Sequence, residues 1–203
     1  MKILEQQRAP NPRRVRIFLA EKGISVPFEP IDLAAGEHRS ESFMQLNPVA
    51  QVPVLVLDDG TAISESVAIC RYFEALQPEP SLMGATPLEA ALIEMWNRRI
   101  EHGLFLAVTQ CFRHTHPAMA NLEVPQVAAW GEANRERAGR HLRMLDAELH
   151  QRPFIAGERF SIADITMRVA VDFMKPARIE RPAGLSGLER WYAEVGARPS
   201  VAA

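Results

Sequence analysis

The fold is decided by residues 47–66, which read NPVAQVPVLVLDDGTAISES. The continuous apolar run at 52–57 is typical of a buried strand, and the turn DDG after it leads into a second short strand at 61–63. This stretch therefore predicts a β-hairpin. A proline opens its first strand, and we predict a cis Val52–Pro53 bond, because an X-Pro bond between a turn and a strand is a place where that isomer is retained.

The residues before the hairpin alternate between strand and helix signals. Residues 3–4 suit a short first strand, and residues 26–31 suit an edge strand because they contain prolines. Between them, Asn11 and Pro12 suit the N-cap and first residue of a helix that ends at Lys22-Gly23. A further helix follows the hairpin at 64–76. The order β-α-β and then β-β-α predicts a thioredoxin-type domain.

The remainder of the chain shows helical signals only. Breakers at 77–84 mark a boundary. Apolar residues from Leu88 to Cys111 follow one helical face, a second long helix comes after Pro125, and Ser161 to Asp164 have the spacing of a capping box. The predicted fold class is α/β plus all-α. It comprises a thioredoxin-like domain at 1–78, a linker at 79–86 and an all-helical domain at 87–203.

Composition excludes several classes of protein. The 203 residues carry a net charge of −2, so nucleic acid is not an expected partner. No apolar run is long enough to span a membrane, and two distant cysteines suit a reducing, cytoplasmic location. His114 and His116 are two residues apart and would point to different faces of a helix, so we expect no metal site.

The first helix lacks the redox cysteines of many thioredoxin-type domains. A C-x-x-C pair would stand at the start of this helix, where the positive helix end stabilises a thiolate. Here the run is Ala9-Pro10-Asn11-Pro12, so dithiol chemistry at this position is excluded. The helix end remains able to hold the thiolate of another molecule.

Three further features favour an anionic, peptide-like ligand. The backbone of Val52 is expected to lack strand partners and to pair with an extended peptide. Glu65 and Ser66 open a helix, where backbone N–H groups and the hydroxyl suit a carboxylate and Glu65 suits an ammonium. The loop at 36–39 offers further donors. A thiol, an amide and a carboxylate beside an ammonium occur together in glutathione.

At this point the chain resembles the glutathione S-transferase family over essentially its whole length. The resemblance is carried by four motifs, at 10–23 (PNPRRVRIFLAEKG), 47–53 (NPVAQVP), 65–69 (ESVAI) and 154–164. It implies a glutathione-binding first domain, a helical domain for an apolar electrophile, a homodimer, a cytoplasmic location and a role in detoxification.

The resemblance also implies roles for individual residues. Val52, followed by Pro53, would bind the cysteinyl residue of glutathione, and Glu65 and Ser66 the γ-glutamyl end, with Gln51 beside them. His38 would reach the glycyl carboxylate, with Arg39 as the alternative. The residues assigned to the electrophile pocket are Gln7, Ala9, Phe105, Val108 and Phe112; the last three could instead pack in the core.

The chain departs from the family at the catalytic position. Ala9 stands where most bacterial and theta-like members have Ser or Cys, and no tyrosine occurs before Tyr72. The chain most resembles the yeast-type branch, in which polar residues of the helical domain hold a water; the matching stretch is 112–116. Weak activity is expected, with Asn11, Arg13 and His114 as candidate catalytic residues.

Two other functions stay open. One is a glutathione-dependent disulfide or peroxide reductase, and the other is a catalytically silent glutathione-binding module. Arg14 and Arg16, like Arg13, are expected on a mostly solvated face of the first helix.

Overall fold

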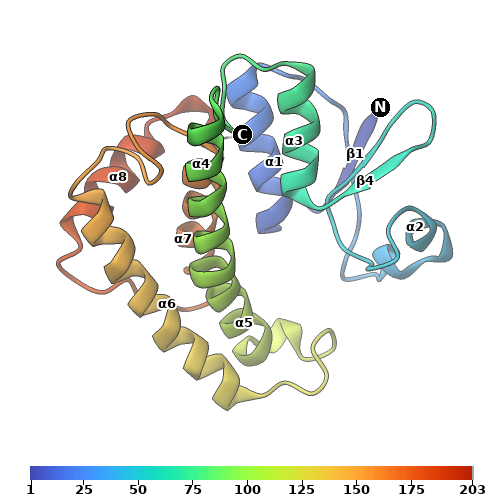
Figure 1. Cartoon of the computed structure of the whole chain (residues 1–203). Helices are drawn as coiled ribbons and strands as arrows, with labels where there is room; N and C mark the ends of the chain where they lie inside the picture. The colour runs from blue at the N-terminus through green and yellow to red at the C-terminus, as the bar shows by residue number, and fades with distance from the viewer. Residues whose placement is uncertain (203) are drawn as a thin grey trace. The chain divides into compact units, whose positions relative to one another are not determined.

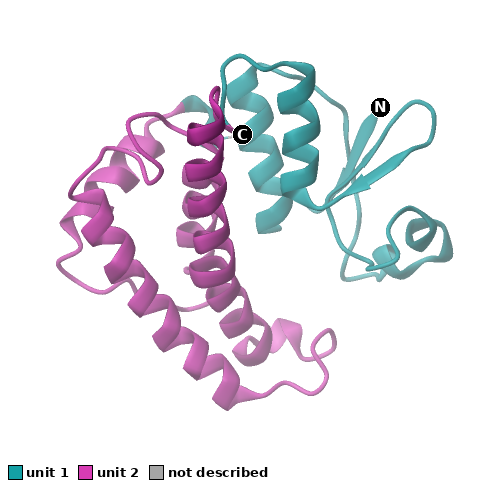
Figure 2. Cartoon of the chain, in the orientation of Figure 1, with its two compact units in different colours: residues 1–82, 199–203 teal, residues 83–198 magenta. Residues whose placement is uncertain are grey.

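The computed structural model describes residues 1–202 and divides into two compact units (Figure 2). Unit 1 contains residues 1–82 together with the residues from Pro199 onward, and unit 2 contains residues 83–198. The sequence had placed the C-terminal residues in the helical domain. They belong instead to unit 1, because η4 (Pro199–Ala202) packs on α1 (Pro10–Lys22) and Arg13 Nη2 donates to the Val201 carbonyl at 3.3 Å.

Unit 1 is built on a four-stranded mixed sheet. Its strand order is β2-β1-β3-β4, with β2 parallel to β1 and the other two pairings antiparallel. The hairpin and the thioredoxin-like arrangement predicted from the sequence are confirmed, and the Val52–Pro53 bond is cis. The strands are β1 (Lys2–Glu5), β2 (Phe28–Pro30), β3 (Val54–Val56) and β4 (Ala62–Ser64).

The helices of unit 1 are α1, η1 (Glu37–Arg39), α2 (Glu41–Leu46) and α3 (Ser66–Leu76). Helices α1 and α3 lie side by side (Figure 1). The N-cap of α1 is Ala9 rather than Asn11, because Pro10 also tolerates the first helical position, where no N–H is needed. Ile69 and Phe73 of α3 are buried, whereas Leu76 in its last turn is 59 % exposed.

The basic residues of α1 are not a solvated face, which corrects the sequence expectation. Arg14 is only 1 % exposed, and Lys22 is 4 % exposed. Both are one helical turn from Phe18, at i, i+4 and i+8, so all three follow the buried side of the helix. Lys22 Nζ lies 2.6 Å from the Glu74 carboxylate and donates to backbone carbonyls at 77 and 80. Arg16 pairs with Glu5.

Unit 2 is all-helical. Helix α5 packs on α6, and α4 on α7, which is buried along almost its whole length. Within the described residues, no helix combines the length and the apolar character that crossing a membrane requires. The elements are α4 (Pro87–Ile100), η2 (Glu101–Phe105), α5 (Leu106–Thr115), η3 (Pro117–Met119), α6 (Ala128–Leu149), α7 (Ile162–Phe173) and α8 (Ser186–Gly196).

The long apolar helix predicted between Leu88 and Cys111 is interrupted. Segment η2 is a turn of π-helix that separates α4 from α5. Gly103 lies within this turn, and a Cβ there would be 2.5 Å from the His141 ring of α6, so the two segments approach closely at that point. Leu88 and Leu92, at the start of α4, are 71 % and 40 % exposed and do not share the buried face.

The capping box at the start of α7 is present as predicted. Asp164 accepts from the Ser161 backbone N–H at 3.0 Å and from the Ser161 hydroxyl at 3.1 Å. Its other oxygen accepts from the Ile155 N–H and from Trp191 Nε1, each at 2.9 Å. This carboxylate therefore ties the start of α7 to α8 and to the preceding loop.

Candidate functional site

Strand pairing in unit 1 gathers the predicted ligand-binding segments at one edge of the sheet. Leu4 and Ser64 both pair with Val54, so the ends of β1 and β4 meet the start of β3. Glu5 pairs with Pro30, so β2 ends at the same edge. The segments that lead into α1, α2 and α3 therefore all leave the sheet there. We call this region the sheet edge.

The first feature of the sheet edge is an extended backbone without strand partners. Val52 precedes β3, which begins at Val54. Within residues 1–202, the structure gives no hydrogen-bond partner to the N–H or the C=O of Val52. A half-buried residue with both backbone groups unpaired can accept an extended peptide as an additional strand. Asn47 Nδ2 supports this loop by donating to the Gln51 carbonyl at 2.8 Å.

The second feature is the start of α3. Glu65 is its N-cap and has a φ of 67°, an uncommon backbone conformation for a residue with a side chain. Ser66 follows, is 5 % exposed, and its hydroxyl accepts from Arg14 Nη1 at 2.9 Å. Glu65 is exposed and makes no side-chain cap, so the first N–H groups of α3 stay available to a carboxylate.

The third feature is the start of α1. Ala9 provides no side-chain cap, and the first turn contains no acidic residue. The helix end therefore keeps its partial positive charge for a ligand. Asn11 is half-buried in this turn, whereas Arg13 is directed to the C-terminal segment, where it donates to the Val201 carbonyl.

His38 and Arg39 differ sharply in exposure. His38 is 7 % exposed, and its Nδ1 has no hydrogen-bond partner within the described chain. Burial, and to a smaller extent the nearby charge of Arg39, lower the pKa of His38. A neutral imidazole can donate one hydrogen bond to a carboxylate but adds no charge, so the exposed Arg39 is the cation of this pair.

The catalytic and electrophile-pocket candidates from the helical part of the chain lie in unit 2. His114 Nδ1 accepts from the Val127 N–H at 3.1 Å, and its Nε2 is 3.7 Å from Glu123. Phe105 and Val108 are 5 % and 0 % exposed and belong to the core of unit 2. Phe112 keeps some exposure and stacks on His116. In unit 1, Gln7 is exposed and Ala9 is half-buried.

Sequence reasoning missed Arg14 as a residue of the sheet edge. Its guanidinium links α1 to the first residue of α3 through the Ser66 hydroxyl. The signal that could have found it is helical spacing, because Arg14 is four residues before the buried Phe18.

Two family models match the chain. One, described as "Glutathione S-transferase, N-terminal domain", matches residues 9–76. The other, described as "Glutathione S-transferase, C-terminal domain", matches residues 128–194. The first covers the starts of α1 and α3 and the backbone at Val52, and the second covers most of unit 2.

Individual relatives agree with these matches over nearly full length. Glutathione S-transferase 2 of Saccharomyces cerevisiae is 40 % identical over 204 residues, covering 99 % of this chain and 88 % of the relative. The crystal structure of Gtt2 from Saccharomyces cerevisiae aligns with a TM-score of 0.95, covering 100 % and 99 %. A glutathione S-transferase domain-containing protein of Marinobacter aquaeolei aligns at 44 % identity with a TM-score of 0.96, covering 99 % and 100 %.

Proposed function

Because this chain belongs to the glutathione S-transferase family, we propose that it binds glutathione at the sheet edge and transfers the thiolate to an apolar electrophile. One observation carries the proposal. An unpaired extended backbone at Val52 and the uncapped starts of α1 and α3 all occur at the same edge of the sheet.

These three features correspond to three parts of the ligand. The amide groups of the cysteinyl residue pair with the Val52 backbone, as a short added strand. The γ-glutamyl carboxylate accepts from the first N–H groups of α3 and from the Ser66 hydroxyl, and its ammonium pairs with Glu65. Gln51 lies beside that end. The glycyl carboxylate is bound by His38 and Arg39.

The start of α1 then stabilises the thiolate in place of a catalytic hydroxyl. A thiol with a pKa near 8.5 is only about 3 % ionised at neutral pH, and a pKa about two units lower raises this roughly 25-fold. That shift corresponds to about 2.7 kcal/mol. A partly buried helix end supplies up to about 2 kcal/mol, and the backbone N–H and the side-chain amide of Asn11 supply further donors, of which Asn11→Ala removes the second. Ala9 supplies no donor, which favours weak activity.

The chemical step is a nucleophilic displacement. The thiol proton passes to solvent, the thiolate sulfur forms a bond to the electrophilic carbon, and the leaving group departs with the bonding electrons. His114 is poorly suited to accept the proton, because its Nδ1 already accepts from Val127. We assign it the lesser role of orienting a water through Nε2.

The test is the pKa of bound glutathione, followed through the ultraviolet absorbance of the thiolate. In the unaltered protein we expect a pKa at least one unit below that of free glutathione, rising by roughly half a unit in Asn11→Ala. Asn121→Ala, an exposed loop asparagine, is the matched control. For His114→Ala, with exposed His102→Ala as control, we expect a smaller rise. An unchanged thiol pKa on binding contradicts the proposal.

Turnover separates the conjugating enzyme from the two alternatives. We expect chlorodinitrobenzene to be conjugated slowly but measurably above the uncatalysed rate. Turnover of a disulfide or peroxide alone indicates a reductase, and glutathione binding without any turnover indicates a binding module.

The homodimer, the cytoplasmic location and the detoxification role implied by the resemblance belong to the same proposal. A native mass measurement at micromolar concentration tests the first, with twice the chain mass of 22.7 kDa expected.

A further inference from the structure

The π-helical turn η2 is held by two residues of α6. Its first backbone bond spans five residues, so the turn contains one residue more than an α-helical turn. Gly103 lies inside it, and a Cβ there would be 2.5 Å from Cε1 and 2.7 Å from Nδ1 of His141. Arg137, one helical turn before His141, donates from Nη2 to the His102 carbonyl at 3.1 Å. The ring and the guanidinium therefore both contact the widened turn.

The extra residue of η2 determines which side of α5 faces the core. Each residue of a helix turns it by about 100°, so an ordinary α-helical turn at η2 would rotate α5 by about that angle. In the observed orientation Ala107, Val108 and Cys111 are each 0 % exposed. His114 follows in the next turn, is half-buried and accepts from the Val127 N–H. The π-helical turn therefore orients His114 as well as the buried side of α5.

The other end of α5 is fixed by a second glycine contact. A Cβ at Gly131 of α6 would be 2.4 Å from Cγ2 of Thr115, the last residue of α5. The Thr115 hydroxyl donates to the Cys111 carbonyl at 2.7 Å. Both ends of α5 thus approach α6 at a residue without a Cβ, and a rotated α5 would lose both contacts.

His141 is the residue in these contacts whose charge changes near neutral pH. Its ring is half-buried, and within residues 1–202 neither ring nitrogen has a hydrogen-bond partner. Burial lowers the pKa of His141, and the charges of Arg137 and Arg140 lower it further. A proton on this ring therefore opposes its packing on Gly103.

The two elements that pack against the middle of α6 are η2 and α5. In η2, the Glu101 carboxylate lies 2.5 Å from Arg98 Nη2, and His102 is exposed. In α5, the first charged side chain is Arg113, near the end of the helix. Among the described residues of these elements, no carboxylate pairs with His141 to stabilise its charged form.

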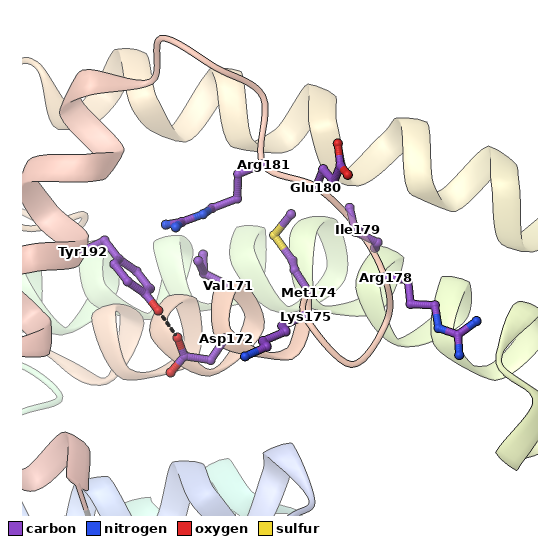
Figure 3. A pocket seen from close by; sticks show the side chains of 9 residues that line it. All are labelled: Val171, Asp172, Met174, Lys175, Arg178, Ile179, Glu180, Arg181 and Tyr192. Atoms are coloured by element: carbon purple, nitrogen blue, oxygen red, sulfur yellow. Dashed lines mark hydrogen bonds between the residues drawn. The ribbon is translucent and has the colours of Figure 1, made fainter.

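Other charges meet α6 away from His141. At the end of α6, Arg190 Nη2 donates to the Leu149 carbonyl at 2.8 Å. The loop after α7, shown in Figure 3 with its charged side chains, meets α6 where Arg135 Nη1 donates to the Arg178 carbonyl. None of these charges contributes to the pKa shift of His141. The charged residues of α8 are Glu189, Arg190 and Glu194.

We propose that His141 is a pH-sensitive switch: the neutral ring packs on Gly103 and holds the π-helical turn, and the protonated ring leaves it, so that η2 relaxes and α5 loses its orientation. The released ring binds a proton more readily than the packed ring. Each pH unit below about 6.5 therefore favours release by up to about tenfold. The switch is a property of unit 2 alone, and only its effect on turnover, through His114, rests on the proposed function.

The first experiment is backbone hydrogen exchange of residues 103–108 in the full chain without glutathione. Rates at about pH 7.5 and about pH 5.5 are corrected for the intrinsic pH dependence of exchange. We expect protection to fall at least about fivefold at the lower pH, and to change less than about twofold in His141→Gln, which cannot be charged. His102→Gln, at the exposed neighbour, is the control and should keep the full loss. An equal loss in His141→Gln overturns the proposal.

Gly103→Ala tests the contact from its other side. Alanine is intrinsically the better helix former by about 1 kcal/mol, so a residue without a special contact should gain protection. We expect the opposite, because the new methyl group displaces the His141 ring at every pH. Gly103→Ala/His141→Ala, in which the methyl group has room, should regain protection and lose the pH dependence. Protection in Gly103→Ala at or above that of the unaltered protein contradicts the switch.

The ring itself can be titrated by nuclear magnetic resonance. The chain has six histidines, and the ring signal that is missing from His141→Gln belongs to His141. We expect its midpoint to lie below that of the exposed His102, assigned in the same way through His102→Gln. Coinciding midpoints overturn the proposal, even if the alanine variants fail to fold.

Turnover shows whether the switch reaches the proposed chemistry. Conjugation of chlorodinitrobenzene is compared at the same two pH values in the unaltered protein and in His141→Gln, so that the ionisation of the thiol affects both alike. We expect the unaltered protein to lose activity several-fold more steeply at the lower pH. Parallel profiles overturn the link between His141 and the orientation of α5. Absence of turnover in both proteins counts against the proposed function instead, and exchange and titration then decide the switch.

Discussion

The starts of α1 and α7 differ in whether side chains of the protein satisfy their first backbone N–H groups. Every helix begins with N–H groups that its own backbone does not satisfy. At α7, Ser161 and Asp164 form a capping box, and the carboxylate is completely buried. At α1, Ala9 contributes no side-chain cap and the first turn has no acid. The start of α7 is therefore closed by the chain's own side chains, whereas the start of α1 is open to a ligand.

This difference indicates that some helix ends contribute to the stability of the fold, whereas others contribute to ligand binding. A closed helix end stabilises the folded state at all times, whereas an open one contributes only when a ligand arrives. The start of α3 resembles α1 in this respect, because Glu65 makes no side-chain cap either. Substitutions at the starts of α7, α3 and α1 test this comparison.

The largest expected effect comes from removing the Asp164 carboxylate that caps the start of α7. Asp164→Ala leaves the buried N–H groups of Ile155, Ser161 and Trp191 without their acceptor. Each such loss costs about 1–3 kcal/mol, so we expect the free energy of unfolding to fall by about 4 kcal/mol. Urea denaturation followed by circular dichroism measures it. Asp58→Ala, at a side chain 86 % exposed, is the control, and a loss below about 1 kcal/mol in Asp164→Ala contradicts the role assigned to the carboxylate.

The buried Asp164 carboxyl should also make the free energy of unfolding depend on pH. Burial raises the pKa of Asp164 from 3.8 to about 6, against the opposing effect of its hydrogen bonds. Between these values the folded state holds a proton that the unfolded state has lost, so stability decreases as pH rises from about 4 to 6. Each pKa unit corresponds to about 1.4 kcal/mol, so this decrease amounts to about 3 kcal/mol.

The measurement is the free energy of unfolding across that pH range, compared with Asp164→Asn. The variant cannot titrate at this position, so the difference between the two proteins isolates the carboxyl. Parallel pH profiles of the two proteins would show that Asp164 keeps an ordinary pKa.

An intermediate effect is expected at the open end of α3. Ser66→Ala removes a hydroxyl that accepts from Arg14 and is proposed to donate to the γ-glutamyl carboxylate. A lost hydrogen bond to a charged group weakens glutathione binding by roughly tenfold. Calorimetric titration measures the affinity, with exposed Ser25→Ala as control. Equal affinities in the two variants would place the ligand elsewhere.

The smallest effect comes from closing the open end of α1. Ala9 has the extended backbone of a typical N-cap, with φ −76° and ψ 142°, so Ala9→Ser should cap the helix. The expected gain in the free energy of unfolding is about 1 kcal/mol. Ala20→Ser, at an exposed position of the same helix, should instead lose about half that amount. If both substitutions destabilise the protein equally, the start of α1 is not an open end.

Local sequence was sufficient for the elements whose signals lie within a few residues. The hairpin follows from an apolar run and a DDG turn, and the capping box from residues three apart. Local residues also indicated Val52, Glu65 and the start of the first helix, but that these segments meet at one edge follows from the strand pairing.

Features that depend on distant neighbours were not predictable. Helical spacing to Phe18 places Arg14 on the buried side of α1, but its partner, the Ser66 hydroxyl of another helix, has no signal in the residues around Arg14. The π-helical turn coincides with the close approach of His141, which comes 38 residues after Gly103. Leu88 continues the apolar spacing of α4 and is nevertheless exposed, because periodicity does not report where the neighbouring helices end.

The return of the last residues to unit 1 makes the helical unit a topological insertion. Residues 83–198 leave unit 1 after Leu82 and come back at Pro199, so the insertion is tethered at both of its ends. A single backbone break in either tether leaves the two units covalently joined. Exchange of the helical unit for that of a relative would therefore require two crossover points, and a chain truncated before Pro199 would lose part of the sheet-bearing unit.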